Sequence, residues 1–294
     1  MRGVSKWFLA TRPWSFTMSA ISVSVGAVLA AGPDFSFFLY VLTVLGMVAL
    51  HGATNLTNDY FDVKSRVDVP DAPTVKYRPH PLAHRDLGLN QVLGLAGVLY
   101  VAGIGIGVFL VATRGWPILA IGLAGVVVSV GYTAGPFPLK YRALGEVAVF
   151  LMWGPLAMAG AYYVQAQTLS LTVLLVSVPF GALVSLVLLA NNIRDVGFDR
   201  RRNIMTIPVL LGEGRARLLY AGLIWLAFFS VGVMAIVGPL SPWSLLVMLA
   251  IPLAAPLMRM VSEKIPDDAD ARTAKLDTAF GVLLLVSLVL DKLL

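Results

Sequence analysis

The sequence predicts an all-α integral membrane protein, a bundle of nine transmembrane helices with its N-terminus in the cytoplasm. Of the 294 residues, 58% are hydrophobic and only 13% are charged, whereas a soluble domain carries about 25% charged residues. The apolar residues gather in runs long enough to cross a bilayer. Almost all lysines and arginines fall in alternate connections between these runs, as expected for a membrane protein with a fixed orientation.

Nine apolar runs lie between charged or Pro- and Gly-rich breaks, and a spanning helix needs roughly 20 such residues. The predicted helices cover residues 14–31, 36–57, 90–112, 117–134, 145–165, 169–190, 217–238, 242–260 and 274–292. No linker or low-complexity tract divides the chain, so we expect a single transmembrane domain over residues 1–294. Cysteine is absent, which excludes disulfides and thiolate metal sites.

The basic residues orient the bundle. Every Lys and Arg except Arg114 and Lys292 lies before the first predicted helix or after an even-numbered one. Short loops rich in Lys and Arg stay in the cytoplasm, so the N-terminus and these loops are predicted to be cytoplasmic. The acidic residues gather mainly on the same side. We therefore interpret the net charge of +6 as an orientation signal and a site for an anionic substrate. The expected partner is the lipid bilayer and not a nucleic acid.

Two polar motifs of similar pattern follow the second and the sixth predicted helix. Motif one is "NLTNDYFDVKSRVD", residues 55–68, and motif two is "NNIRDVGFDRRRN", residues 191–203. Four helices separate them, an even number, so both are expected at the cytoplasmic face. The repetition predicts two related four-helix halves, about residues 14–134 and 145–260, followed by a ninth helix.

Helical spacing brings the acidic side chains of each motif onto one face. Asp195 and Asp199 are four residues apart, and Asp59 and Asp62 are three apart. Asn55, four residues before Asp59, extends the first polar stripe inward. Carboxylates this close repel each other unless a cation lies between them.

A hard divalent cation would remove this repulsion, and Mg²⁺ prefers carboxylates together with substrate phosphate oxygens. Two facing motifs could therefore hold a diphosphate through bridging Mg²⁺ ions. The predicted metal ligands are Asn58, Asp59, Asp62, Asp68, Asp195 and Asp199. The basic side chains that could neutralise the remaining phosphate charge are Arg66, Arg78, Lys140, Arg194 and Arg200. The competing interpretation is ordinary loop charges at helix ends, and the recurrence of the Asn-Asp pattern on matching helices favours the site.

In these motifs the chain resembles the UbiA superfamily of intramembrane prenyltransferases, which have nine transmembrane helices and two aspartate-rich motifs. "NDYFD" at residues 58–62 matches the start of the first motif, and "DVGFD" at 195–199 matches the second. The family's last aspartate of the first motif would fall at Arg66, and this chain has Asp68 instead. That spacing is similar to the menaquinone branch, which prenylates 1,4-dihydroxy-2-naphthoate.

Two further stretches, residues 132–165 and 191–212, also resemble the menaquinone branch. Residues 76–88, with His84 and Arg85, are closer to other branches. Acceptors used elsewhere in the superfamily therefore stay open as alternatives: 4-hydroxybenzoate, a chlorophyll- or haem-type ring, or an ether-lipid acceptor.

The resemblance implies Mg²⁺-dependent transfer of a polyprenyl group from polyprenyl diphosphate to an aromatic acceptor, here 1,4-dihydroxy-2-naphthoate in menaquinone biosynthesis. The expected catalytic residues are Asp62, Asp195 and Lys140. The expected substrate-binding residues are Asn55, Arg66, Arg78, Tyr132, Lys140, Arg194 and Arg12. Metal and basic groups would stabilise the departing diphosphate, and an apolar, aromatic interior would shield the carbocation from water. Anchoring at the membrane interface is the alternative role for Arg12 and Lys140.

A transporter is the alternative from another class, because transporters also combine repeats with charged residues. Their charges lie near the middle of the span, whereas these crowd one face. His51, inside the second predicted helix, is interpreted as a neutral histidine bonded to a neighbouring helix. His80 and His84 lack partners at metal-ligand spacing and are not assigned as ligands. Residues 263–272 are interpreted as a solvated loop rather than a third metal site.

Overall fold

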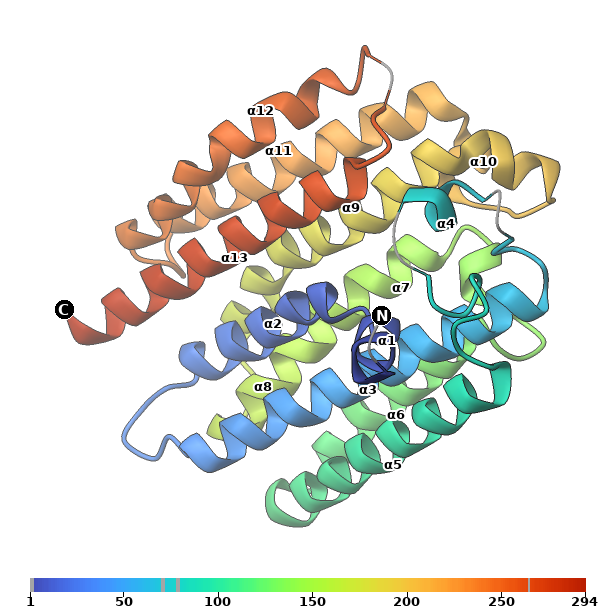
Figure 1. Cartoon of the computed structure of the whole chain (residues 1–294). Coiled ribbons are helices and arrows are strands. Elements are labelled where there is room, and N and C mark those ends of the chain that lie inside the picture. The colour runs from blue at the N-terminus through green and yellow to red at the C-terminus, as the bar shows by residue number, and fades with distance from the viewer. Residues whose placement is uncertain (1–2, 70–71, 78–79, 264) are drawn as a thin grey trace.

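The computed structural model describes residues 3–69, 72–77, 80–263 and 265–294, and these form long helices packed side by side (Figure 1). In chain order the elements are α1 (Gly3–Ala10), η1 (Pro13–Ser15), α2 (Phe16–Leu29), α3 (Phe37–Lys64), α4 (Pro73–Tyr77), α5 (Leu89–Arg114), α6 (Trp116–Gly131), η2 (Leu139–Tyr141), α7 (Gly145–Leu151), η3 (Met152–Leu156), α8 (Ala157–Ala166), α9 (Leu171–Arg201), α10 (Ile207–Leu211), α11 (Glu213–Val237), η4 (Pro242–Ala250), α12 (Ile251–Arg259) and α13 (Ala269–Leu293). The described residues form no β-strand, which agrees with the predicted all-α class.

Seven helical segments within the described residues are long and apolar enough to cross a membrane, so the protein is an integral membrane protein. They are Phe37–Lys64, Leu89–Arg114, Gly145–Ala166, Leu171–Arg201, Glu213–Val237, Pro242–Arg259 and Ala269–Leu293. Two shorter apolar helical segments, Pro13–Leu29 and Trp116–Gly131, coincide with the first and fourth predicted spans. The number of nine spans and the cytoplasmic N-terminus stay predictions.

Two helices extend well beyond the apolar runs that predict them. The second predicted span ends at residue 57 and the sixth at residue 190, but α3 continues to Lys64 and α9 to Arg201. Most of motif one and nearly all of motif two are therefore helical, and the helical spacing of their acidic side chains applies. Lys64 at the end of α3, and Arg200 and Arg201 at the end of α9, favour these helix ends because cations complement the negative end of the helix dipole.

The main apolar core lies around α9, which packs against α11, α13 and the α7–η3 segment. Phe180 on α9, Tyr220 on α11 and Phe280 on α13 are among the largest fully buried side chains. A second, smaller apolar cluster joins α1, α3 and α5 to the loop before α5. The helices that carry the two motifs thus belong to different clusters, α3 to the smaller one and α9 to the main one, and they lie in different parts of the bundle (Figure 1).

The span formed by α7, η3 and α8 is interrupted by a π-helical turn. Pro155 lies in this turn and cannot donate a backbone hydrogen bond, which accounts for the irregularity. Gly154 of the same turn meets Gly181 of α9 so closely that a Cβ on Gly154 would lie 3.2 Å from the Cα of Gly181. Glycine at both positions lets the two backbones touch, which brings Met152 and Trp153 to the space beside α9.

The contact between α2 and α8 yields a stability prediction. A Cβ at Gly26 would overlap the carbonyl oxygen of Met158 on α8, whereas a Cβ at Gly105 on α5 would meet nothing within 4 Å. We expect Gly26→Ala to destabilise the folded protein by about 1–3 kcal/mol through overpacking. Gly105→Ala should leave stability unchanged or slightly higher, since alanine is the better helix former. The melting temperatures of both variants in detergent test this, and equal melting of Gly26→Ala and wild type would contradict it.

Candidate active site

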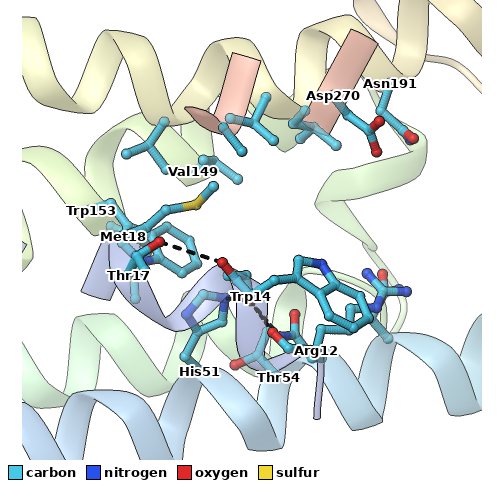
Figure 2. Close-up of a pocket in the computed structure, with 18 of the residues that line it drawn as sticks. Arg12, Trp14, Thr17, Met18, His51, Thr54, Val149, Trp153, Asn191 and Asp270 are labelled. Atoms are coloured by element: carbon cyan, nitrogen blue, oxygen red, sulfur yellow. Dashed lines mark hydrogen bonds between the residues drawn. The ribbon is translucent and has the colours of Figure 1, made fainter. Parts of the chain in front are cut away.

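A cavity of about 1120 Å³ lies between α2, α3, α9 and α13. Its wall is mainly apolar, with Met18, Val149 and Trp153 on one side (Figure 2). Asn191 and Asp270 lie across the open space from Arg12 and Thr54 (Figure 2). Polar residues concentrate where motif one borders the cavity: the lining there includes Arg12, Asn55, Asn58, Asp62, Asp68, Tyr132 and Lys140.

A second cavity of about 40 Å³ adjoins the first and shares Asp68, Thr74, Lys140 and Asn191 with it. Asp195 and Asp199 also line this small cavity. Carboxylates from motif one and motif two therefore face the same small space, although more than a hundred residues separate them in the sequence. This is the arrangement that a shared cation and diphosphate site requires.

Asp62 is the most enclosed carboxylate of motif one. It accepts hydrogen bonds from Lys140, from the hydroxyl of Tyr141 and, at 3.0 Å, from the amide of Asn58 one helical turn earlier. Lys140 also donates to Asn58 Oδ1 at 3.1 Å. The short helix η2 positions Lys140, whose backbone N–H donates to the carbonyl of Tyr132 at 2.9 Å. Burial beside Asp62 raises the pKa of Tyr141, so its hydroxyl remains a donor.

Asp59 pairs with Arg12, which lies just before η1. It lines neither cavity. One turn earlier, the amide of Asn55 donates to the carbonyl of Thr11 at 3.0 Å and to Ser15 Oγ at 3.2 Å. Asp59 and Asn55 therefore hold the start of α2 against α3, and Arg12 is placed so that it lines the large cavity.

A left-handed turn at the end of α3 positions Asp68. Arg66 has φ 59°, and the backbone N–H groups of Val67 and Asp68 both return to the carbonyl of Asp62, at 2.8 and 3.1 Å. The turn reverses the chain and brings the Asp68 carboxylate back beside the motif. Burial raises the pKa of Asp68, but the hydrogen bond from His80 and the charge of Lys140 outweigh it and bring the pKa to about 2. Asp68 is therefore ionised at neutral pH.

Motif two is held by a single guanidinium. Arg194 Nε donates to Asp195 Oδ1 at 2.7 Å, and Nη2 donates to Asp195 Oδ2 at 2.9 Å. The same guanidinium donates to Thr74 on α4 at 2.9 Å and to the carbonyl of Asp267 at 2.9 Å, and it lies 3.5 Å from Asp270 on α13. Arg194 therefore ties α4, α9 and α13 together.

Asp199, the other carboxylate of motif two, accepts fewer hydrogen bonds than Asp195. Asp199 accepts a hydrogen bond of 3.3 Å from Thr206, and Asp195 accepts one of 3.0 Å from Thr74 in addition to its contacts with Arg194. Asp199 and Asp195 both face the small cavity.

The structure gathers most of the predicted site residues, but not all of them. Arg66 is exposed and lines neither cavity, and its carbonyl accepts a 2.6 Å hydrogen bond from Arg202. Its left-handed backbone, with φ 59°, lies in the turn that ends α3, and its predicted role in binding substrate stays a prediction. Arg194 lies at the site with its donors already engaged, as a clamp rather than a free phosphate ligand. Arg78 lies outside the described residues.

Several residues at the site were not predicted. Tyr141 and Thr74 bind Asp62 and Asp195, and His80 binds Asp68 at 2.9 Å. Tyr141 follows Lys140 directly, which was the only local signal for it. The interpretation of residues 263–272 as a solvated loop is wrong at Asp270, which is buried at the start of α13 and pairs with Arg194.

His51 is bonded to the neighbouring helix, as interpreted from the sequence. Its Nδ1 lies 2.8 Å from Ser19 Oγ on α2, and its Nε2 lies 3.2 Å from Ser15 Oγ in η1. Trp153 Nε1 donates to Ser19 at 3.0 Å, so the histidine belongs to a polar chain along the wall of the large cavity. Both ring nitrogens have partners within the protein.

The donor set fits Mg²⁺. Asp68, Asp195 and Asp199 offer carboxylate oxygens to the small cavity, and Asp62 and Asn58 line the adjoining end of the large cavity. Among the described residues, Asp59, Asp68 and His80 also bring one ligand atom each within 4.8 Å of one another. The oxygen ligands dominate, and oxygen ligands suit a hard divalent cation rather than a thiophilic one.

The fold and the cavity define an integral membrane protein that can hold a ligand with a charged head and a long apolar tail. The chain belongs to the UbiA prenyltransferase family, whose pattern matches residues 19–284, and it is therefore a prenyl-transferring enzyme.

Named relatives agree with this membership. The chain is 29% identical over 286 residues to the 1,4-dihydroxy-2-naphthoate octaprenyltransferase of Bacillus subtilis, covering 96% of this chain and 91% of the relative. It is 31% identical to the UbiA prenyltransferase domain-containing protein 1 of Xenopus tropicalis, covering 97% of this chain and 81% of the relative. The structure of a UbiA homolog from Archaeoglobus fulgidus bound to GPP and Mg²⁺ has the same fold, with a TM-score of 0.71 at 13% identity, covering 97% of this chain and 99% of that one.

The Arg194 clamp yields a second stability prediction. Arg194→Ala would remove the cation that binds the buried Asp195 and would break the contact between α9 and Asp270 on α13, so we expect a loss of on the order of 3 kcal/mol in folding stability. The matched control is Arg272→Ala, which breaks an exposed ion pair with Asp268 on the surface of α13 and should change little. Melting temperatures in detergent compare the two, and an equal, small effect would show that Arg194 does not hold the helices together.

Proposed function

We propose that this enzyme transfers a polyprenyl group from polyprenyl diphosphate to 1,4-dihydroxy-2-naphthoate, with Mg²⁺ as cofactor, at the cytoplasmic face of the membrane. The observation that carries the proposal is the joining of two spaces: an apolar cavity of about 1120 Å³ and a small acidic cavity that share Lys140 and Asp68. A prenyl diphosphate has the same division, with an apolar chain and an anionic head.

The proposed metal ligands are Asp68, Asp195 and Asp199, which line the small cavity, and Asp62 and Asn58, which line the large cavity next to it. Bound Mg²⁺ would supply positive charge that neutralises the diphosphate as it leaves. Asp59, the remaining predicted ligand, is paired with Arg12 and lines neither cavity, so we assign it to holding Arg12 in place.

Lys140 and Arg12 border the large cavity together with the polar residues of motif one, and Lys275 on α13 also lines this cavity. Lys140 is partly exposed, with 21% of its side-chain surface accessible, so its ammonium group can reach a ligand while it pairs with Asp62. Charge developing on the leaving diphosphate is stabilised by donors that are already in place, without reorganisation. We therefore assign Lys140 a catalytic role and Arg12 a role in binding the diphosphate, with Tyr132 and Asn55 as neighbouring polar contacts.

The apolar wall protects the carbocation that ionisation of an allylic diphosphate produces. Met152, Trp153, Val184 and Leu188 line the cavity and offer few groups that could add to it. Exclusion of water prevents hydrolysis of the reactive intermediate. The indole face of Trp153 can also stabilise positive charge.

The choice of acceptor rests on the relatives. The Bacillus subtilis relative, matched over 96% of this chain, is named for 1,4-dihydroxy-2-naphthoate. The similarity extends over nearly the whole length of both proteins, which supports one transmembrane domain. The two related four-helix halves and the ninth helix stay a prediction from the sequence.

The proposal is tested with purified protein, radiolabelled polyprenyl diphosphate and a panel of acceptors. We expect prenylated 1,4-dihydroxy-2-naphthoate to form at least about tenfold faster than prenylated 4-hydroxybenzoate, a difference of roughly 1.4 kcal/mol in the barrier. Chelation of divalent cations with EDTA should stop the reaction, and Mg²⁺ should restore it. Prenylation of another acceptor alone would reject the assigned substrate while leaving the family chemistry in place.

Substitutions of two proposed metal ligands and of Lys140 test the roles assigned to these residues. Asp62→Ala and Asp195→Ala should each reduce turnover by far more than about tenfold. Lys140→Ala should reduce kcat by about 100-fold or more, because it removes a donor to the developing charge. Arg272→Ala, which changes an exposed cation away from both cavities, is the control and should turn over like wild type. Steady-state rates in excess Mg²⁺ give the comparison, and equal rates for Lys140→Ala and Arg272→Ala would leave Lys140 with an anchoring role only.

A further inference from the structure

His80 lies buried between two carboxylates of motif one, with 2% of its surface exposed. Its Nε2 lies 2.9 Å from Asp68 Oδ2 and 3.7 Å from Asp59 Oδ1. Within the part of the chain that the structure describes, His80 is the one residue outside motif one that forms a hydrogen bond to the Asp68 side chain. The imidazole is therefore the contact that fixes how this carboxylate points.

The backbone determines which ring nitrogen carries the proton. The N–H of Ala83 donates to His80 Nδ1 at 3.2 Å, so Nδ1 is an acceptor and the neutral ring carries its hydrogen on Nε2. That hydrogen points to Asp68, which accepts it. His80 acts toward Asp68 as a directed N–H donor and needs no positive charge to do so.

The loop that carries His80 is held firmly. The N–H of His84 returns to the carbonyl of His80 at 3.0 Å, and the N–H of Asp86 returns to the carbonyl of Pro81 at 2.8 Å. Leu82 and Leu87 of the same loop are buried against the apolar cluster of α1, α3 and α5. The ring is thus fixed in position by its own loop and by the apolar cluster of α1, α3 and α5.

We propose that His80 is a positioning residue that holds Asp68 in the orientation needed for metal binding, acting as a neutral N–H donor. This inference rests on the proposed function, in which Asp68 is a ligand to Mg²⁺. Asp68 lies on a turn beyond the end of α3, where no helix fixes its side chain, whereas Asp62 is held within the helix. A ligating carboxylate that is hydrogen-bonded by an outer partner loses metal affinity when that partner is removed, typically by about 10–100-fold.

The test measures metal binding directly, without substrate or turnover. Mn²⁺, which takes the same oxygen ligands, is titrated into the purified protein, and the free ion is followed by electron paramagnetic resonance. We expect His80→Ala to weaken Mn²⁺ binding by about 10–100-fold. His80→Gln should stay within about threefold of wild type, because its amide N–H reaches the place of Nε2–H and preserves the outer-shell donor. His84→Ala, a neighbouring exposed histidine in the same loop, is the matched control and should bind like wild type.

The outcomes separate this inference from the function on which it rests. If His80→Ala does not fold, His80→Phe, which keeps a buried ring but has no donor, replaces it and should show the same loss. Equal binding by wild type and His80→Phe would overturn the inference alone. A loss in His80→Gln as large as that in His80→Ala would also overturn it, since a charge or a direct metal bond would then be required. No binding by wild type would overturn the proposed metal dependence together with this inference.

Discussion

The structure depends on the neutralisation of carboxylates that are buried at the ends of membrane-spanning helices. An uncompensated charge there would be very costly, so each must find a cation or a set of donors. Asp62 is matched by Lys140, Asp59 by Arg12 and Asp195 by Arg194. In the first two cases the partner comes from a different part of the fold, and Arg194 reaches out to α4 and α13. Charge pairing therefore decides how the helix ends are gathered around the two cavities.

The same pairing shapes how a ligand can bind. Asp62 and Asp195 are compensated by Lys140 and Arg194, so a divalent cation bound at these carboxylates would share them with the two basic side chains. A lysine displaced from Asp62 by a metal would remain beside it, free to meet a phosphate oxygen. The same side chains would then serve both the ion pairs of the protein and the binding of a diphosphate.

The sequence predicts the scaffold well because lipid imposes simple rules. Runs of apolar residues locate every long helix, and the i, i+3 and i, i+4 spacing of the acidic residues applies because α3 and α9 continue through the motifs. What periodicity cannot predict is which loop returns to which helix end. Thr74, which binds Asp195, is 121 residues away from it in the sequence, and Tyr141, which binds Asp62, is 79 residues away from it. Arg66 was expected at the site on grounds of proximity, but it is exposed in the turn that ends α3, and His80 was set aside because its partner, Asp68, is 12 residues away.

The left-handed turn at Arg66 also bears on how such enzymes are recognised from sequence. In this turn the backbone N–H groups of Val67 and Asp68 both bind the carbonyl of Asp62. The side chain of Asp68, six positions after Asp62, therefore comes back beside α3. An acidic side chain four positions after Asp62 on an uninterrupted helix would reach a similar place. A sequence pattern that requires one fixed number of residues between the two aspartates separates chains with an interval of four from chains with an interval of six. That number depends only on how the helix ends. A sequence pattern that allows an interval of four or six residues would group both kinds of chain. For the interval of six it would also ask for a residue that tolerates positive φ at the position of Arg66.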